Sequence, residues 1–279
     1  MTSPLVSICI PTYKGAEFLG KTLDSVLNQS YPHFELLVLD DNSPDNTPSI
    51  VSAYQDQRIK YVRNAQNQGP QENWNKCLEL AQGKYFKLLP HDDLLAPGCL
   101  EEQVSILEAD KSGEIALVFG ARQIIDPSGR VLMERGLPGV KAGRIERSAL
   151  IKQCIRAGTN LIGEPGNGLF RRSLIQSVGV YDASHPYLVD LDYWFRILMH
   201  GDAYYTKKIT SAFRVCAGSW SVSIGGAQYR DFKGFVDKFC TDMRYNISRF
   251  DRITGLIRAR LNTAARAVIY TYLFSKNTK

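Results

Sequence analysis

Short apolar runs alternate with helical repeats along the first half of the chain. The apolar and β-branched runs predict strands, and the segments between them carry apolar residues at the three- and four-residue spacing of amphipathic helices. Strands that alternate with helices in this way predict an α/β fold with a mostly parallel sheet flanked by helices. The expected strands lie at residues 6–10, 35–39, 59–62, 85–93 and 116–119.

The second half of the chain has a less regular pattern. Residues 228 to about 275 predict a basic amphipathic helical segment, so we expect a main domain over residues 1–227 and a helical tail over residues 228–279. We also expect two shorter helices, one from a cap at Ser148 to about Gly158 and one at 190–200. The remaining features are a tight turn at 126–129 between two short strands, a mobile loop at 134–147 and a turn-rich segment at 163–168.

Two pairs of aspartates stand where predicted strands end. Asp40 and Asp41 follow one apolar run, and Asp92 and Asp93 close another. Ligands of open α/β sheets bind outside the carboxyl ends of the strands. Adjacent buried carboxylates need a counter-charge, and hard divalent cations take oxygen ligands. The pattern therefore predicts one site for a phosphate-bearing ligand and a metal.

The composition is typical of a globular protein, and the cysteines favour a reducing compartment. The 279 residues are 44% hydrophobic and 22% charged, which is enough for a sizeable core. Six cysteines are scattered without a paired spacing, which favours the cytosol. We expect no secretory leader before the first strand, and no apolar run reaches the roughly 18 residues of a membrane span.

The net charge of +6 is concentrated at the C-terminal end. From Tyr229 onward there are eleven Lys and Arg against four Asp and Glu. Such a basic amphipathic segment predicts binding to an anionic membrane surface. Packing of its apolar face on the main domain, or pairing of two chains, would explain the same pattern. Nucleic-acid binding is not expected, because no recognition motif accompanies the charge.

Five motifs, taken in order, resemble the family 2 glycosyltransferases. They are Val-Ser-Ile-Cys-Ile-Pro-Thr-Tyr-Lys-Gly at 6–15, Leu-Asp-Asp-Asn-Ser at 39–43, Asn-Gln-Gly at 67–69, Gly-Lys-Tyr-Phe-Lys-Leu-Leu-Pro-His-Asp-Asp at 83–93 and Val-Asp-Leu-Asp-Tyr-Trp-Phe-Arg at 189–196. The resemblance covers residues 5 to roughly 220 and implies an inverting enzyme of the GT-A fold. It also implies transfer of a sugar from a nucleotide-diphosphate donor to a hydroxyl acceptor.

The resemblance assigns the nucleotide to the first three motifs. Pro11 and Tyr13 match the loop that holds the base, with the tyrosine as its stacking face. Asp41 matches the aspartate that accepts a hydrogen bond from uracil, which favours UDP and leaves dTDP open. Asn67 either shapes its loop or reaches the nucleotide.

The same resemblance assigns the metal and the chemistry to three aspartates. Asp92 matches the residue near the ribose, Asp93 the ligand of Mn²⁺ or Mg²⁺, and Asp190 the catalytic base. A glycan or polyprenyl-linked acceptor in bacterial surface polysaccharide or lipopolysaccharide assembly is implied as well. Such an enzyme would be cytoplasmic or peripheral on the inner face of the cell membrane.

Two positions depart from the family pattern. Many relatives carry a histidine where this chain has Cys216, and a glutamate where it has Val189. Three rival interpretations remain from the sequence. The acidic pairs could cap loops and helices without chemistry, the chain could be an inactive nucleotide-sugar-binding relative, or it could be a sugar nucleotidyltransferase. The last is a poor match, because residues 11–15 are not a Gly-rich basic loop. A dinucleotide oxidoreductase is a still poorer match, since G-x-G-x-x-G is missing after the first strand.

Overall fold

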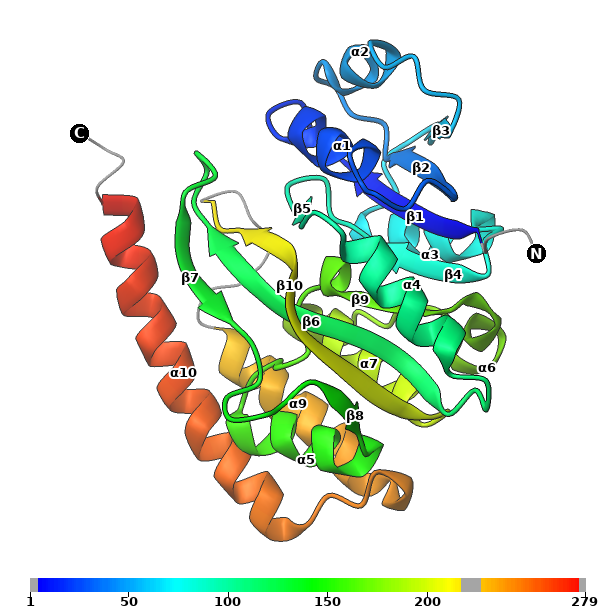
Figure 1. The fold of residues 1–279 in the computed structure, drawn as a ribbon. Coiled ribbons are helices and arrows are strands. Elements are labelled where there is room, and N and C mark those ends of the chain that lie inside the picture. The colour runs from blue at the N-terminus through cyan, green and yellow to red at the C-terminus, as the bar shows by residue number, and fades with distance from the viewer. Residues whose placement is uncertain (1–4, 217–226, 276–279) are drawn as a thin grey trace.

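A large central sheet with helices on both faces forms the body of the protein (Figure 1). The computed structural model describes residues 5–216 and 227–275. The strands are β1 (Val6–Thr12), β2 (Phe34–Asp40), β3 (Ile59–Arg63), β4 (Tyr85–Leu88), β5 (Leu94–Leu95), β6 (Ile115–Ile125), β7 (Val131–Arg135), β8 (Gly143–Ile145), β9 (Gly168–Arg171) and β10 (Asp202–Arg214). The helices are α1 (Leu19–Leu27), α2 (Thr47–Ser52), α3 (Pro70–Leu80), α4 (Cys99–Ala109), α5 (Arg147–Ala157), α6 (Ile175–Val178), α7 (Val189–Leu198), α9 (Gln228–Thr241) and α10 (Arg249–Ser275).

The sheet has a parallel half and a mixed half. Its strand order is β3-β2-β1-β4-β9-β6-β10-β5. The first four strands in this order are parallel, as the alternation of strands and helices predicts. In the second half β9 runs antiparallel to both β4 and β6, whereas β6 and β10 are parallel. The carboxyl ends of β1, β2 and β4 therefore meet at one edge, which is where the acidic pairs stand.

The alternation of side chains along the strands builds a core on each face of the sheet. In β1, for example, Ile8 faces one core and Cys9 the other. Helices α1, α2 and α4 cover the first face. Helices α3, α5, α7 and α9 cover the second face. The site is thus held between two well-packed layers.

The tail helices pack on the body. Phe232, Phe235 and Phe239 of α9 are buried in the same core as α7. Helix α10 lies along α5 and α9, and a side chain at Gly255 would place its Cβ only 2.3 Å from the carbonyl oxygen of Ile155. The tail is also not one continuous helix, because α9 and α10 are separate. None of the helices in the described parts of the chain is long and apolar enough to cross a membrane.

Local boundaries differ from the sequence prediction in three places. The loop expected at 134–147 is wrong in part, because β7 continues to Arg135 and β8 occupies Gly143–Ile145. Helix α5 is capped by Glu146, whose carboxylate accepts the backbone N–H groups of Ser148 and Ala149, so the cap predicted at Ser148 is wrong by two residues. The third difference is at α2: the Thr47-Pro48 pair predicts Thr47 as the helix cap, but Thr47 is the first residue of the helix.

Candidate active site

The acidic turn after β4 holds one buried and one partly exposed carboxylate. Asp93 is 2% exposed, and Asp92 beside it is partly exposed. The hydroxyl oxygen of Thr22 on α1 lies 2.6 Å from the carbonyl oxygen of His91 and 2.9 Å from that of Asp93, which fixes the turn. Burial raises the pKa of Asp93 well above its usual range, and the charges of Asp92 and Glu164 act in the same direction. This carboxyl group therefore needs a counter-charge to stay ionised.

Arg214 at the end of β10 clamps the same turn. Its backbone N–H donates to Oδ1 of Asp93 at 3.0 Å, and its Nε donates to the carbonyl oxygen of Asp92 at 2.8 Å. Its guanidinium also donates to the carbonyl oxygens of Asp126 and Pro127 and lies over the ring of Phe18. The turn is therefore held from a strand more than a hundred residues away in the sequence.

The residues assigned to the nucleotide lie at the adjacent strand ends. Pro11 is a buried residue of β1, whereas Tyr13 just beyond it exposes 41% of its surface. A Cβ on Gly15 would lie 3.2 Å from the imidazole of His91, so the Tyr13 loop abuts the acidic turn. An exposed tyrosine ring at this edge offers a face for stacking on a base.

Asp41 holds a loop as well as standing at the end of β2. Its carboxylate accepts the backbone N–H of Gln68 at 2.9 Å and of Gly69 at 2.8 Å, and also the side-chain amide of Asn64. The Nδ2 of Asn67 donates to the carbonyl oxygen of Asp41. These bonds join β2 to the start of α3. Asp41 thus shapes the loop directly, with room left on its carboxylate for a further donor.

Asp190 lies in the first turn of α7. Its Oδ1 accepts the backbone N–H of Leu191 at 2.7 Å, and its Oδ2 accepts the side-chain amide of Asn160 at 2.8 Å. Burial and then the charge of Glu164 raise the pKa of Asp190 to about 7, while those hydrogen bonds and Arg122 oppose the rise. A carboxylate with this pKa is matched to proton transfer near neutral pH.

The neighbouring Asp192 has a structural role. It is 2% exposed and forms ion pairs with Arg196 at 2.7 Å and Lys238 of α9 at 2.5 Å. Those cations neutralise it and join α7 to α9. Of the two aspartates, only Asp190 therefore has a carboxylate directed to the site.

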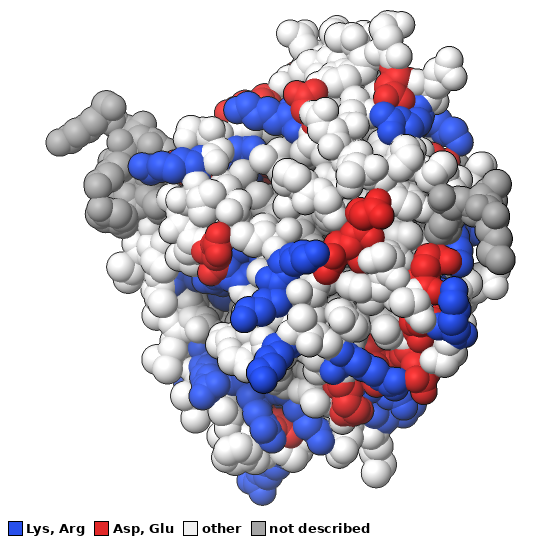
Figure 2. All heavy atoms as spheres, viewed as in Figure 1, with Lys and Arg blue, Asp and Glu red and all other residues white. Residues whose placement is uncertain are grey.

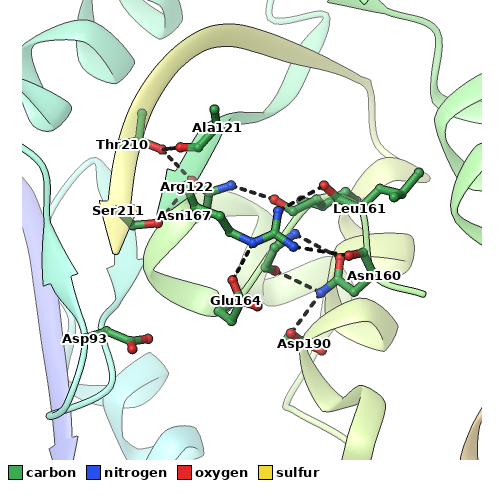
Figure 3. A network of polar contacts seen from close by, with 12 residues as sticks. Asp93, Ala121, Arg122, Asn160, Leu161, Glu164, Asn167, Asp190, Thr210 and Ser211 are labelled. Atoms are coloured by element: carbon green, nitrogen blue, oxygen red, sulfur yellow. Dashed lines mark hydrogen bonds and ion pairs between the residues drawn. The ribbon is translucent and has the colours of Figure 1, made fainter. Parts of the chain in front are cut away.

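A third carboxylate, that of Glu164, lies between Asp93 and Asp190 (Figure 3). Glu164 forms an ion pair with Arg122 of β6, with 2.6 Å between Oε2 and Nε. Arg122 also donates to the carbonyl oxygens of Asn160 and Leu161. Figure 3 shows Asp93 on one side, Asp190 on the other, and the Glu164–Arg122 pair between them. The pair links the segment that positions Asp190 to the central sheet.

One cavity of about 250 Å³ brings these groups together. Asp93 from the β4 turn and Asp190 from α7 both line it, although 97 residues separate them in the sequence. Pro11, Tyr13, Asp41 and Asn67 are outside its lining and stand at the neighbouring strand ends. The lining also includes Trp74, Asp92, Arg122, Arg135, Asn160, Glu164, Tyr187, Val189, Arg266 and Ile269.

A model of the glycosyl transferase family 2 matches residues 7–179, which is more than half of the chain. The chain belongs to this family. An uncharacterized glycosyltransferase of Rickettsia typhi is 29% identical over 215 residues, which are 76% of this chain and 64% of that relative. The chain thus spans less than two thirds of that relative. The putative teichuronic acid biosynthesis glycosyltransferase TuaG of Bacillus subtilis is 40% identical over 106 residues, or 37% of this chain and 42% of TuaG.

Solved structures confirm the predicted GT-A fold. S. aureus TarS in complex with UDP-GlcNAc matches with a TM-score of 0.68 and 18% identity, over 92% of this chain and 72% of TarS. A mannosyltransferase from Pyrobaculum calidifontis in complex with GDP-Man and Mn²⁺ matches with a TM-score of 0.58 and 19% identity, over 98% of this chain and 76% of that one. The chain therefore has the GT-A fold.

The acidic turn of this family member fits a divalent cation whose remaining ligands come from a bound phosphate and water. In the described residues, no three His, Cys, Asp or Glu side chains converge on one metal position. Mg²⁺ is commonly held by one or two carboxylates together with substrate phosphates and water. Asp93, whose buried carboxylate needs a counter-charge, and Asp92 supply that number of ligands.

The residues that sequence reasoning missed reach the site from distant segments. Asn160 and Arg214 contact the aspartates, and the paired Arg122 and Glu164 line the same cavity, but no motif in the sequence marks their roles. Glu164 stands in a segment that the sequence identifies only as turn-rich. Cys216, which replaces the usual histidine of the family, is partly buried next to the undescribed residues 217–226.

Proposed function

We propose that the enzyme transfers a sugar from a nucleotide-diphosphate donor to a hydroxyl of a glycan or lipid-linked acceptor, with inversion at the anomeric carbon. The observation that carries the proposal is the shared cavity of Asp93 and Asp190. A group that binds the donor diphosphate and a group that removes a proton are the two requirements of this reaction, and they face one space.

Asp190 would act as the general base. The acceptor hydroxyl gives its proton to the carboxylate while its oxygen bonds to the anomeric carbon and the bond from that carbon to the donor phosphate breaks. The electron pair of that bond leaves with the nucleoside diphosphate. General base catalysis of this kind contributes about 10²–10⁴-fold. Asn160 and the N–H of Leu191 hold the carboxylate in place for this step.

Asp92 and Asp93 would hold Mn²⁺ or Mg²⁺ on the donor side. When bound, the metal neutralises the charge that develops on the leaving diphosphate. Arg214 keeps the two aspartates in position through the bonds described above. Tyr13 would stack on the base, Pro11 would shape its loop, and Asp41 and Asn67 would face the uracil edge, so UDP is the favoured nucleotide and dTDP the alternative.

Surface polysaccharide assembly is the setting that we propose. The name of TuaG assigns that relative to teichuronic acid biosynthesis, and TarS binds UDP-GlcNAc. We further propose a cytoplasmic enzyme on the inner face of the cell membrane. The six cysteines are free, which suits a reducing compartment.

The outer face of α10 supports a membrane location. Its exposed apolar residues recur at helical spacing and point away from the body, and the exposed Arg258 and Arg260 flank them. Such a stripe with basic borders suits the surface of an anionic bilayer. The stripe consists of Phe250, Ile253, Ile257, Leu261 and Val268.

A thermal-shift panel tests the proposed donor and metal. A ligand that binds only the folded state raises its stability by RT ln(1 + [L]/Kd). We expect UDP or dTDP to raise the Tm in the presence of Mn²⁺, GDP and CMP to do so less, and Asp93→Ala to abolish the shift. Asp56→Ala, which removes a surface carboxylate paired with Arg58, is the matched control and should keep it. A protein with no nucleotide shift and no UDP release from donor and acceptor would contradict the proposal.

A further inference from the structure

A second cavity of about 490 Å³ adjoins the first on the side away from the nucleotide loops. Arg122, Arg135, Asn160 and Arg266 line both cavities. The lining of the second cavity includes neither Asp92 nor Asp93, and no residue of β1–β4. A molecule that reaches Asp190 and Asn160 from this side therefore approaches opposite to the donor, where an acceptor must enter.

Positive charge collects in this second cavity. Its ionisable lining residues are three arginines and Glu134, whose carboxylate accepts from Gln123. Arg122 is already paired with Glu164. Figure 2 shows basic side chains on the surface over the region of α5 and α10, some of them beside acidic side chains. The cavity thus has more cations than its own anions neutralise.

Arg266 of α10 is held by neutral groups. Its guanidinium donates to Oγ1 of Thr159 at 2.7 Å and to Oε1 of Gln228 at 3.3 Å, and it lies 5.4 Å from the ring centre of Tyr187. These contacts orient the guanidinium at the cavity wall without neutralising it. The helix that carries the outer apolar stripe therefore also supplies a fixed cation to the inside.

Arg135 of β7 has no ion pair with a carboxylate of the described residues. The residue is exposed at the cavity rim, where partial desolvation and then the charges of Arg122 and Arg266 lower the pKa of its guanidinium. Two tail arginines outside the cavity are paired instead, Arg252 with Asp237 and Arg244 with Asp242. Arg135 and Arg266, which line the same cavity, repel one another, and a bound anion would remove that repulsion.

From this arrangement we infer that Arg135 and Arg266 bind an anionic group of the acceptor, a phosphate or a carboxylate close to the hydroxyl that receives the sugar. The inference rests on the proposed function, because it names the chemistry of that acceptor. Guanidinium groups present paired N–H donors that match phosphate and carboxylate oxygens. The metal and the nucleotide loops remain free for the donor at the other end.

Binding of three oligomers of similar length tests the inference without relying on transfer. The probes are a glycerol phosphate oligomer, an oligogalacturonate and a neutral dextran fragment, titrated with the wild-type enzyme at low and high NaCl. We expect at least one anionic probe to bind more tightly than dextran, and to weaken with salt. Preference for the first probe identifies a phosphate, and preference for the second a carboxylate.

Three variants locate the binding. Arg135→Gln and Arg266→Gln should each weaken the preferred anionic probe about tenfold, as expected for one charge-assisted hydrogen-bonded contact. Arg249→Gln removes the same charge from an exposed position of α10 and should leave the affinity unchanged. Because Arg266 also anchors α10, the Tm of each variant is measured, and Arg135→Gln carries the test if Arg266→Gln is unstable.

The results that would overturn this inference differ from those that would contradict the proposed function. Equal affinity for dextran and both anionic probes, or unchanged affinity in Arg135→Gln, would overturn the anionic acceptor. The thermal shift with UDP and Mn²⁺ is measured on the same samples. The inference is supported if this shift persists in Arg135→Gln while binding of the anionic probe is lost. A missing shift in the wild type would count against the donor proposal instead.

Discussion

The backbone N–H of Arg214 donates to the buried carboxylate of Asp93 across 3.0 Å, which ties the last residue of β10 to the turn after β4. The side chain of Arg214 binds the carbonyl oxygen of Asp92 in the same turn. The C-terminal half of the sheet thus sets the geometry of carboxylates that belong to the N-terminal half. Mutations far from the acidic motif should therefore act on it.

Replacing Arg214 by lysine should weaken binding of Mn²⁺ with UDP. A lysine retains the charge but loses the fork that reaches the carbonyl oxygens of Asp92 and Asp126. Loss of a group that orients metal ligands costs about 10–100-fold in metal affinity. Titration of Mn²⁺ in saturating UDP measures the effect. Arg130→Lys, at an exposed partner of Asp126, is the control. Equal Mn²⁺ affinity in both variants would show that the clamp is irrelevant to the metal.

The pH dependence of kcat/KM should report Asp190. Its pKa is raised to about 7, and a base acts only when deprotonated, so the rate should fall about tenfold per pH unit below pH 7. Asn160→Leu removes a hydrogen bond that favours the carboxylate and should move this limb to higher pH. Asp190→Asn should lose about 10²–10⁴-fold in kcat and retain the UDP-dependent thermal shift. A limb that stays near pH 4 in the wild type would rule out this assignment.

Lys87 should be needed for the segment that carries Glu164. Its buried ammonium donates to the carbonyl oxygens of Gly166 at 2.8 Å and Gly168 at 2.9 Å. Lys87→Met leaves these carbonyls without that donor, which costs about 1–3 kcal/mol, and it should lower both the Tm and kcat. Lys84→Met breaks a half-exposed ion pair with Glu108, worth about 0–1 kcal/mol, and a contact of the ammonium with the Tyr85 ring. Chemical denaturation of both variants compares them, and equal stabilities would refute the role of Lys87.

The apolar stripe of α10 should mediate binding to anionic vesicles. Ile257→Glu and Leu261→Glu place charges in the exposed stripe, and together they should abolish flotation with vesicles that contain phosphatidylglycerol. Thr254→Glu, on the same helix but partly buried, tests the effect of charge alone and should reduce flotation less. Deletion of residues 228–279 is unsuitable, because it would remove the core residues of α9. Undiminished recovery of the double variant would leave the stripe without a membrane role.

The sequence predicts the first half of this fold well, because local signals determine it. Strands β1 to β4 and the helices between them follow from periodicity and from turn residues such as Gly69 and Pro70. The aspartates follow from motifs at strand ends. Neither signal applies to Glu164 or Arg122, whose pairing joins segments that only the sheet order brings together. The antiparallel placement of β9 between β4 and β6 is likewise a long-range result, with no local pattern that predicts it.

Helix α10 has its apolar stripe on the outside and Arg266 at the cavity wall. With its side chains, an α-helix is about 10–12 Å across. Because the close approach at Gly255 holds the helix against α5, its place on the body is fixed. On an enzyme adsorbed through the stripe, the helix would act as a spacer of about one helix diameter between the lipid headgroups and the catalytic cavity. Carriers whose accepting sugar stands much nearer to or farther from the bilayer would then be excluded by geometry alone.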